Sequence, residues 1–120
     1  MDARDVRIGD KVRFSGEIFT IKAIDEKYVE FIGGENANTT HISGVPLTDT
    51  ILDKIGATYR VMTTDYIIQL QNGKQIILRP QMGDDNYTAI VKDAYSTPKR
   101  KVTYLHDLQH YVWDVCKCIL

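Results

Sequence analysis

The stretch 66–79, YIIQLQNGKQIILR, decides the fold of this chain. Two apolar runs flank Asn72-Gly73, a dipeptide that favours two-residue type I′ hairpin turns because both positions tolerate a positive φ. Pairing about such a turn sets Ile68 opposite Ile77 and leaves apolar side chains on both faces of the pair. The sequence therefore predicts an antiparallel hairpin whose base is covered on both sides.

Flanking segments extend the hairpin into a sheet. Segments 59–62 and 87–91 have the composition of strands, so we expect an antiparallel meander over residues 58–92. A short helix is expected before it, over residues 46–57. Thr48 suits its N-cap, and Gly56 suits the left-handed position after its last turn. A helix this short is stable only when it packs on something else.

The first 45 residues have the pattern of short, half-buried strands. Polar and apolar residues alternate in three segments, which are separated by turn residues. Three strands this short, and curved by glycines, predict a small SH3-like β-barrel or strongly twisted sheet over residues 1–45. The expected strands are 11–14, 17–24 and 27–32, followed by a polar loop over 33–40 and one further short strand at His41-Ile42.

A helix is expected at the C-terminal end, over residues 102–118. Thr103 suits its N-cap, and apolar residues recur at 3.6-residue spacing, which marks a buried face. The buried stripe comprises Tyr104, Leu108, Tyr111, Val112, Val115 and Ile119. The sequence thus predicts an α+β fold in which this helix packs on the sheet, and residues 1–120 form a single domain around one core.

Composition narrows the function classes. The chain has 120 residues, 43% hydrophobic and 26% charged, and 15 basic against 16 acidic side chains give a formal net charge of −1. Such values exclude intrinsic disorder and most coiled-coil structure. The longest apolar run is far shorter than the ~20 residues of a membrane span, and residues 1–5 lack the apolar segment of a signal peptide. We therefore expect a soluble, cytoplasmic protein with no membrane partner.

The outer face of the predicted C-terminal helix carries the first candidate site. His106, His110, Trp113 and Lys117 follow one another at i, i+4, i+7 and i+11, opposite the apolar stripe. An exposed tryptophan beside histidines is typical of a protein-contact patch, because indole buries a large area and carries one polar group. The alternative is that Trp113 lies in the core or at its rim.

Metal binding is a second possibility for the same helix. His106 and His110 have the spacing of two ligands on one helix face, and Cys116 and Cys118 follow closely. A continuous helix, however, points the two cysteines away from the histidines and from each other. A bond between cysteines one residue apart would also be strained, which favours reduced thiols. We expect neither a metal nor another cofactor.

A basic run precedes the helix. Lys99, Arg100 and Lys101 could contact phosphates, which makes nucleic-acid binding the alternative function. The remaining bases near the N-terminus are interleaved with acids, so a broad positive surface is not expected. An unidentified protein is therefore the preferred partner, and nucleic acid is disfavoured.

Catalytic motifs do not emerge. Asp84-Asp85 occupies a predicted turn, where acids are ordinary, and the segment HISG at 41–44 lacks the G-x-S-x-G nucleophile elbow. Gly33-Gly34 precedes Glu35 where a phosphate-binding loop has Lys and Ser or Thr. We expect a non-enzymatic protein. The alternative is an unrecognised site that encloses His41 or His106 beside an acid.

Three sequence motifs resemble, in the same order along the chain, those of a protein family. They are RIGDKV at 7–12, VPLTDTILDKIG at 45–56 and VTYLHDLQ at 102–109. The chain resembles small uncharacterised proteins of prophages and mobile elements in gut Bacteroidetes, with the pattern IG[ND]xV, PLTxxxLxKxG and YxHxLQ. The resemblance implies an α+β domain of phage or mobile-element origin and brings no assigned reaction. His106 matches the histidine of the family pattern, whereas His110 stands where the family has asparagine.

Overall fold

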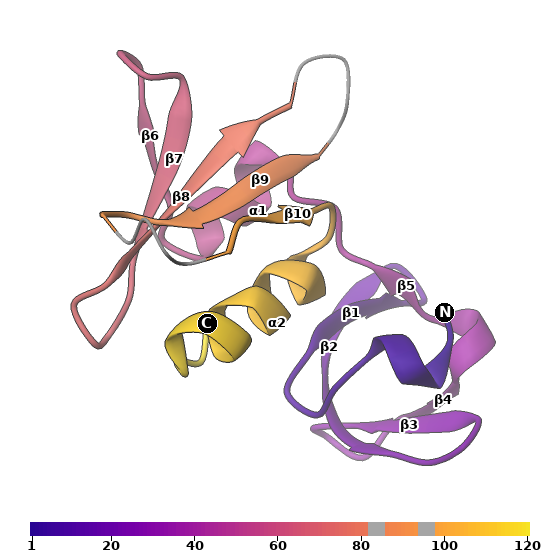
Figure 1. The fold of residues 1–120 in the computed structure, drawn as a ribbon. Helices are drawn as coiled ribbons and strands as arrows, with labels where there is room; N and C mark the ends of the chain where they lie inside the picture. Colours follow the sequence, from indigo (N-terminus) through magenta and orange to yellow (C-terminus); the bar gives the residue numbers. More distant parts are fainter. Residues whose placement is uncertain (82–85, 94–97) are drawn as a thin grey trace. The chain divides into compact units, whose positions relative to one another are not determined.

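Two five-stranded antiparallel sheets make up the fold (Figure 1). The computed structural model describes residues 1–81, 86–93 and 98–120. Its chain divides into a first unit, Met1–Val45 with Tyr104–His106, and a second unit, Pro46–Thr103 with Asp107–Leu120. The predicted α+β class is confirmed. The chain forms two compact units, each with its own buried apolar side chains, and each is described by itself below. That residues 1–120 form a single domain stays a prediction.

The sheet of the first unit has the strand order β4-β3-β2-β1-β5. Short 3₁₀ turns precede and interrupt the strands. The elements in chain order are η1 (Ala3–Asp5), β1 (Lys11–Phe14), β2 (Glu17–Ile24), β3 (Tyr28–Phe31), β4 (Asn36–Asn38), η2 (Thr39–His41) and β5 (Ser43–Gly44).

Local backbone chemistry explains the curvature of this sheet. Ser15 and Gly16 connect β1 to β2 with φ values of 52° and 81°, a two-residue turn in which both residues are left-handed. The pairing of β2 with β3 then shifts register between Ile21 and Ala23. Such an irregularity bends and twists a strand, so the long β2 pairs with β1 along one half and with β3 along the other.

Two predictions for this unit are wrong. The segment predicted as a polar loop contains β4, whose Ala37 pairs with Val29 and is 5% exposed. One apolar residue among asparagines is too weak a signal for a strand. The short strand expected at His41-Ile42 lies instead at Ser43–Gly44, because η2 takes up His41.

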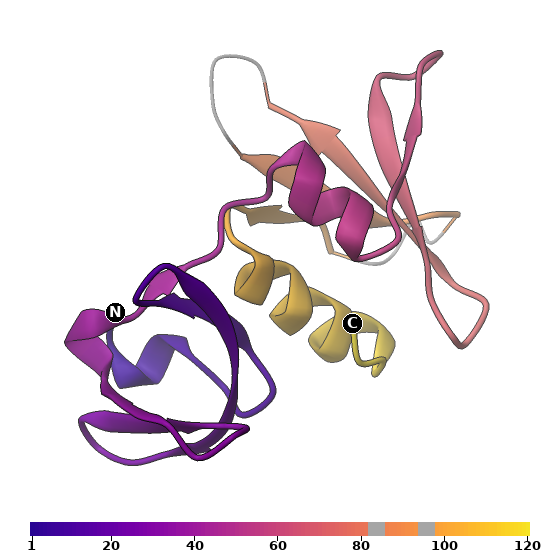
Figure 2. The same ribbon diagram turned by 180° about the vertical axis from the view of Figure 1, so that it is seen from behind.

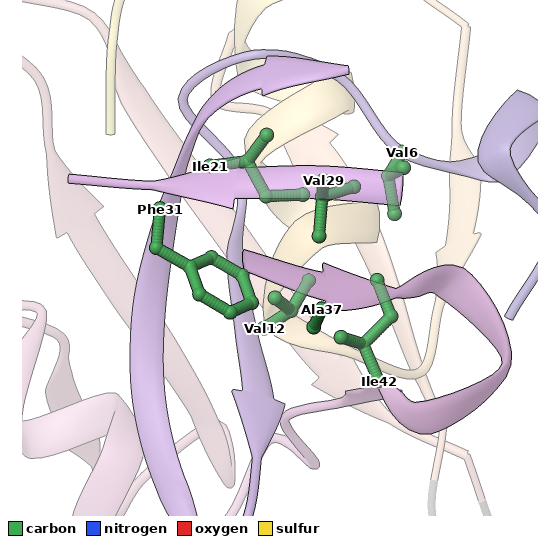
Figure 3. Close-up of a cluster of buried hydrophobic side chains, with 7 residues drawn as sticks. All are labelled: Val6, Val12, Ile21, Val29, Phe31, Ala37 and Ile42. Carbon is green, nitrogen blue, oxygen red and sulfur yellow. The ribbon is translucent and has the colours of Figure 1, made fainter. Parts of the chain in front are cut away.

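Seven buried apolar side chains converge inside the first unit (Figure 3). The Phe31 ring lies among them and stacks on Phe19 with a centroid distance of 4.7 Å. Burying a valine, isoleucine or phenylalanine side chain contributes about 1.5–3 kcal/mol each, so the cluster holds the small sheet together. Its members are Val6, Val12, Ile21, Val29, Phe31, Ala37 and Ile42.

The sheet of the second unit has the strand order β10-β9-β8-β7-β6 and includes the predicted meander. Its described elements are α1 (Asp49–Lys54), β6 (Thr58–Arg60), β7 (Asp65–Gln69), β8 (Gln75–Pro80), β9 (Tyr87–Val91), β10 (Arg100–Val102) and α2 (Leu105–Cys116), of which the first two residues of α2 count with the first unit. No helix in these described ranges is long and apolar enough to cross a membrane.

The central hairpin forms, but its predicted register is wrong by one residue. Ile67 pairs with Ile77 and Ile68 with Ile76. The amide of Leu70 donates to the Lys74 carbonyl, which leaves a three-residue loop, Gln71-Asn72-Gly73, in which the glycine has a φ of 86°. A left-handed glycine at the end of a three-residue loop is the usual bulged alternative to the type I′ turn.

A tertiary contact favours the longer loop. The side-chain amide of Asn72 donates to the carbonyl oxygen of Cys116 at 3.3 Å, and its carbonyl oxygen accepts the amide of Lys74 at 3.1 Å. Carbonyls in the last turn of a helix lack helical partners, so the loop residue supplies one to α2. Side chains alternate between the two faces of a strand. A register shift of one residue therefore changes which side chains of β7 share a face with those of β8.

Both helices of the second unit interact with the same face of its sheet. Tyr66 donates its hydroxyl to Asp49 of α1 at 2.5 Å, and Arg100 pairs with Asp114 of α2 at 3.0 Å. Cross-strand pairing from β6 to β10 puts Tyr66, Leu78 and Arg100 in one row on one face. Figure 2 shows α1 lying against this sheet. The face toward the helices holds the buried residues Ile68, Ile76, Leu78, Ala89, Val91 and Val102.

The caps predicted for the short helix are confirmed. The hydroxyl oxygen of Thr48 accepts the amide of Ile51 at 3.3 Å, and Gly56 has a φ of 86°. The helix itself is Asp49–Lys54, shorter than the predicted 46–57. Thr48 therefore satisfies one of the amides left without a partner at the helix start.

The C-terminal helix is shorter than predicted at both ends. Val102 belongs to β10 and pairs with Tyr87, so the helix begins at Leu105 and not at 102. It ends at Cys116, and Ile119 of the predicted buried stripe is 81% exposed. Periodicity alone could not show that the basic run before the helix would add a strand to the sheet.

Candidate functional site

The end of α2 brings together two of the predicted contact residues. Trp113 is 48% exposed, and the ammonium nitrogen of Lys117 lies 5.6 Å from the centroid of its ring. Lys117 follows the last helical residue with a φ of 54°, and its amide donates to the Trp113 carbonyl at 3.0 Å. This is a left-handed helix cap, which fixes the backbone of Lys117 relative to that of Trp113. The pair presents a half-exposed aromatic ring with a cation over its face.

His106 does not belong to this surface, so its prediction as an outer-face residue is wrong. Its side chain is 5% exposed, and its ring lies parallel to that of Tyr104 with a centroid distance of 5.7 Å. The reason is that residues 104–106 belong to the first unit, where the amide of Leu105 donates to the Val45 carbonyl at 2.8 Å. The spacing of residues along a helix could not predict that this part of α2 is buried.

His110, the other histidine of the predicted patch, is intermediate in solvent exposure. His110 is half-buried on the second turn of α2. The predicted four-residue patch therefore reduces to an exposed pair, Trp113 and Lys117, with His110 partly accessible on the same helix. Whether this surface binds a partner stays a prediction.

The basic run is divided between two faces of the sheet. Arg100 lies on the helix side, where its guanidinium pairs with Asp114 at 3.0 Å and lies 5.4 Å from the Tyr111 ring centroid. Lys99 and Lys101 are exposed. Tyr111 is itself buried, which raises the pKa of its phenol, and it donates to the Pro98 carbonyl at 2.8 Å. Arg100 therefore connects β10 to α2 inside the second unit.

A stability measurement separates this role from phosphate binding. Arg100→Ala is expected to lower the free energy of unfolding by about 1 kcal/mol, because it removes a partly exposed ion pair and a cation–π contact. Lys99→Ala, an exposed neighbour, is expected to change it by less than about 0.5 kcal/mol. Chemical denaturation followed by circular dichroism measures both. Equal effects of the two variants would contradict a structural role for Arg100.

The two cysteines are free thiols and both are buried. Burial raises the pKa of the Cys116 thiol, so this group is protonated and unreactive near neutral pH. Within the described ranges, no group of three or more His, Cys, Asp or Glu side chains is arranged to hold a metal ion.

The described residues that were weighed for catalysis lie in different elements. His41 is exposed at the end of η2, and His106 is buried against Tyr104. Gly33 and Gly34 form the turn after β3. The predicted turn at Asp84-Asp85 lies outside the described residues.

A second surface was missed by sequence reasoning. On the sheet face opposite α1 and α2, Ile67, Ile77 and Ile90 are direct cross-strand neighbours on β7, β8 and β9. We call this row the isoleucine face. The two-residue turn assumed from Asn72-Gly73 paired Ile68 with Ile77 instead. Reading residues 71–73 as a three-residue loop would have revealed the row.

An ion pair borders the isoleucine face. Asp65 is 2% exposed, and its two carboxylate oxygens each accept a hydrogen bond from Arg60 at 2.7 Å. The hydroxyl of Thr63 donates to the same carboxylate at 2.7 Å. These donors hold the pKa of Asp65 below its ordinary value, against the opposing effect of burial.

No family model, curated protein or solved structure matches this chain. The site is therefore interpreted from its own residues.

Proposed function

We propose that this chain is a non-enzymatic, protein-binding module and that Trp113 and Lys117 form the centre of its contact surface. The observation that carries this proposal is the half-exposed indole with the Lys117 ammonium 5.6 Å from its centroid. Tryptophan is among the residues that contribute most to protein–protein affinity.

The first unit is proposed to be a small SH3-like barrel that supports this function. Support comes from the strand order β4-β3-β2-β1-β5, the bent β2 shared between two sets of partners, and the 3₁₀ turn before the last strand. Small barrels of this kind commonly serve as binding modules, although a fold alone does not define a function.

We further propose a bacterial context. The three motifs at 7–12, 45–56 and 102–109 resemble those of prophage and mobile-element proteins, which favours an accessory role there. The two free thiols are in keeping with a reducing cytoplasm. Nucleic-acid binding through Lys99, Arg100 and Lys101 is the less favoured function, because Arg100 is already paired with Asp114.

Trp113→Ala is expected to weaken capture of the partner at least about tenfold while it leaves the melting temperature nearly unchanged. Protein purified from the native host by an affinity tag would identify the partner by mass spectrometry. Titration of that purified partner with each variant then measures the affinity.

Met62→Ala is the matched control, because Met62 is 96% exposed at the β6–β7 turn, away from the α2 sequence. It is expected to leave the affinity unchanged. A large loss of stability in Trp113→Ala would mean that the indole packs in the core, and unchanged affinity would overturn the contact surface. Salt-dependent binding of DNA or RNA that is lost in a Lys99→Gln/Lys101→Gln variant would promote the nucleic-acid alternative.

A further inference from the structure

The loop between β7 and β8 contains the one Asn-Gly dipeptide of the chain, Asn72-Gly73. An asparagine before glycine is prone to deamidation, because no side chain hinders the attack of the glycine nitrogen on the asparagine amide. Both residues are exposed, so water reaches them. The other three asparagines precede Ala37, Thr39 and Tyr87, whose side chains hinder the same attack.

The side chain of Asn72 also connects this loop to α2. Its amide nitrogen donates to the carbonyl oxygen of Cys116 at 3.3 Å, and its amide oxygen accepts the backbone amide of Lys74 at 3.1 Å. The first bond needs a donor and the second needs an acceptor. An ionised carboxylate only accepts, so it keeps the bond within the loop and loses the bond to the helix.

The end of α2 is sensitive to a charge at this position. Cys116 is the last residue of the helix, where the backbone carbonyls form the negative end of the helix dipole. A carboxylate at position 72 would face these carbonyls with a charge of the same sign. The same turn includes Trp113 and Lys117, because the Lys117 amide donates to the Trp113 carbonyl at 3.0 Å.

We propose that Asn72 is a site of spontaneous deamidation and that its product releases the loop 71–73 from the end of α2. The inference goes beyond the proposed function and does not depend on it, since the reaction needs neither a partner nor an enzyme. It converts a neutral donor, fixed on the helix, into a negative charge that the helix end repels.

The reaction consumes one water molecule and releases one ammonia. The Gly73 nitrogen gives up its proton to base and forms a bond to Cγ of Asn72, and the bond from Cγ to Nδ2 breaks as ammonia leaves. Water then opens the five-membered imide ring at either of its two carbonyls, which yields aspartate or isoaspartate. The Gly73 amide donates to the Leu70 carbonyl at 3.1 Å, so the reaction proceeds from the opened loop.

The first test measures the reaction in the full chain. The protein is incubated in mildly alkaline buffer, and peptide mapping by mass spectrometry follows each asparagine over time. Asn38 is the matched comparison, because its amide oxygen accepts the Thr40 amide two positions later, as Asn72 does with Lys74. We expect Asn72 to deamidate at least about tenfold faster than Asn38.

Gly73→Ala tests the role of the glycine. A Cβ atom at this position meets no other atom within 4 Å, so the variant is expected to fold despite the φ of 86°. The new methyl group hinders the attack of the nitrogen, and we expect deamidation of Asn72 to slow by about tenfold. An unchanged rate would contradict the proposed reaction.

The second test measures the release of the loop. Asn72→Asp supplies the product, and hydrogen exchange of the Lys117 amide, followed by nuclear magnetic resonance, is expected to accelerate at least about fivefold. Asn38→Asp is the charge-matched control and is expected to leave this rate within about twofold. The amide oxygen of Asn38 accepts two hydrogen bonds from Thr40, a role that aspartate can also fill. Thermal melts check that both variants stay folded.

The deamidated wild-type protein provides an independent sample. It carries one more negative charge, so anion exchange separates it from the starting material, and its Lys117 amide should exchange as fast as in Asn72→Asp. Emission from Trp113, the one tryptophan of the chain, should change in the same two samples. Equal deamidation of Asn72 and Asn38, or equal Lys117 exchange in Asn72→Asp and Asn38→Asp, would overturn the proposal.

Discussion

Asp65→Ala is expected to lower the free energy of unfolding by about 2–3 kcal/mol. The carboxylate is 2% exposed and accepts two hydrogen bonds from Arg60 and one from Thr63. Its removal leaves the guanidinium without its acceptor, although the arginine side chain is 33% exposed and can be partly rehydrated. Urea denaturation of the wild-type and variant proteins, followed by circular dichroism, measures the difference.

The difference in stability between the wild type and Asp65→Ala is expected to depend on pH. Hydrogen bonds from Arg60 lower the pKa of Asp65 in the folded state below its ordinary value of 3.8. The carboxylate therefore contributes its full stability above pH 3.8, and the contribution is lost as the pH falls through the lower folded pKa. We expect the gap between wild type and Asp65→Ala to be constant near neutral pH and to shrink in acid. A gap that stays constant into strong acid would contradict the ion pair.

Gly44→Ala is expected to lower the free energy of unfolding by about 1–3 kcal/mol, because the new methyl group has no room. A Cβ atom at this position would lie 2.5 Å from Cγ and 2.6 Å from Cδ1 of Tyr104. These atoms are at the root of the ring, so the whole side chain must move. That movement disturbs the parallel contact between Tyr104 and His106 and the hydrogen bond from Leu105 to Val45. Chemical denaturation measures the loss.

A second substitution should partly restore stability. Tyr104→Ala removes the two shortest contacts and retains the contact to the Tyr104 Cβ, at 3.0 Å. We expect the free energy lost in the Gly44→Ala/Tyr104→Ala variant to be smaller than the sum of the two single losses. Strict additivity would show that the ring and the new methyl group do not collide. Gly44 does not have a positive φ, so backbone strain of the left-handed kind does not add to the loss in Gly44→Ala.

Local signals in the sequence predicted most of the elements. Alternation placed β1 at Lys11–Phe14 and β2 at Glu17–Ile24, and strand-like composition placed β9 at Tyr87–Val91, each with the bounds that the structure has. Thr48 and Gly56 also cap the short helix as expected. These features succeeded because each depends on a few neighbouring residues and on backbone preferences.

The predictions failed where contacts between residues far apart in the sequence determine the structure. The observed hairpin register is favoured by a hydrogen bond from Asn72 to Cys116, 44 positions away in the chain. The buried state of His106 depends on its inclusion in the first unit. Trp113 and Lys117 of the predicted contact patch lie together because they are close in the sequence. The isoleucine face depends on pairing among three strands, so local spacing did not predict it.

The first unit is not one continuous piece of chain, because Tyr104–His106 complete it after 58 residues that belong to the second unit, Pro46–Thr103. During synthesis on a ribosome, the N-terminal sheet can therefore pair its strands early but cannot reach its final form until residue 106 has been made. The second unit is then already present as nascent chain, since synthesis proceeds from the N-terminus. Cutting the chain after Val45 would leave the sheet without the Tyr104 ring beside Gly44 and without the amide that binds the Val45 carbonyl.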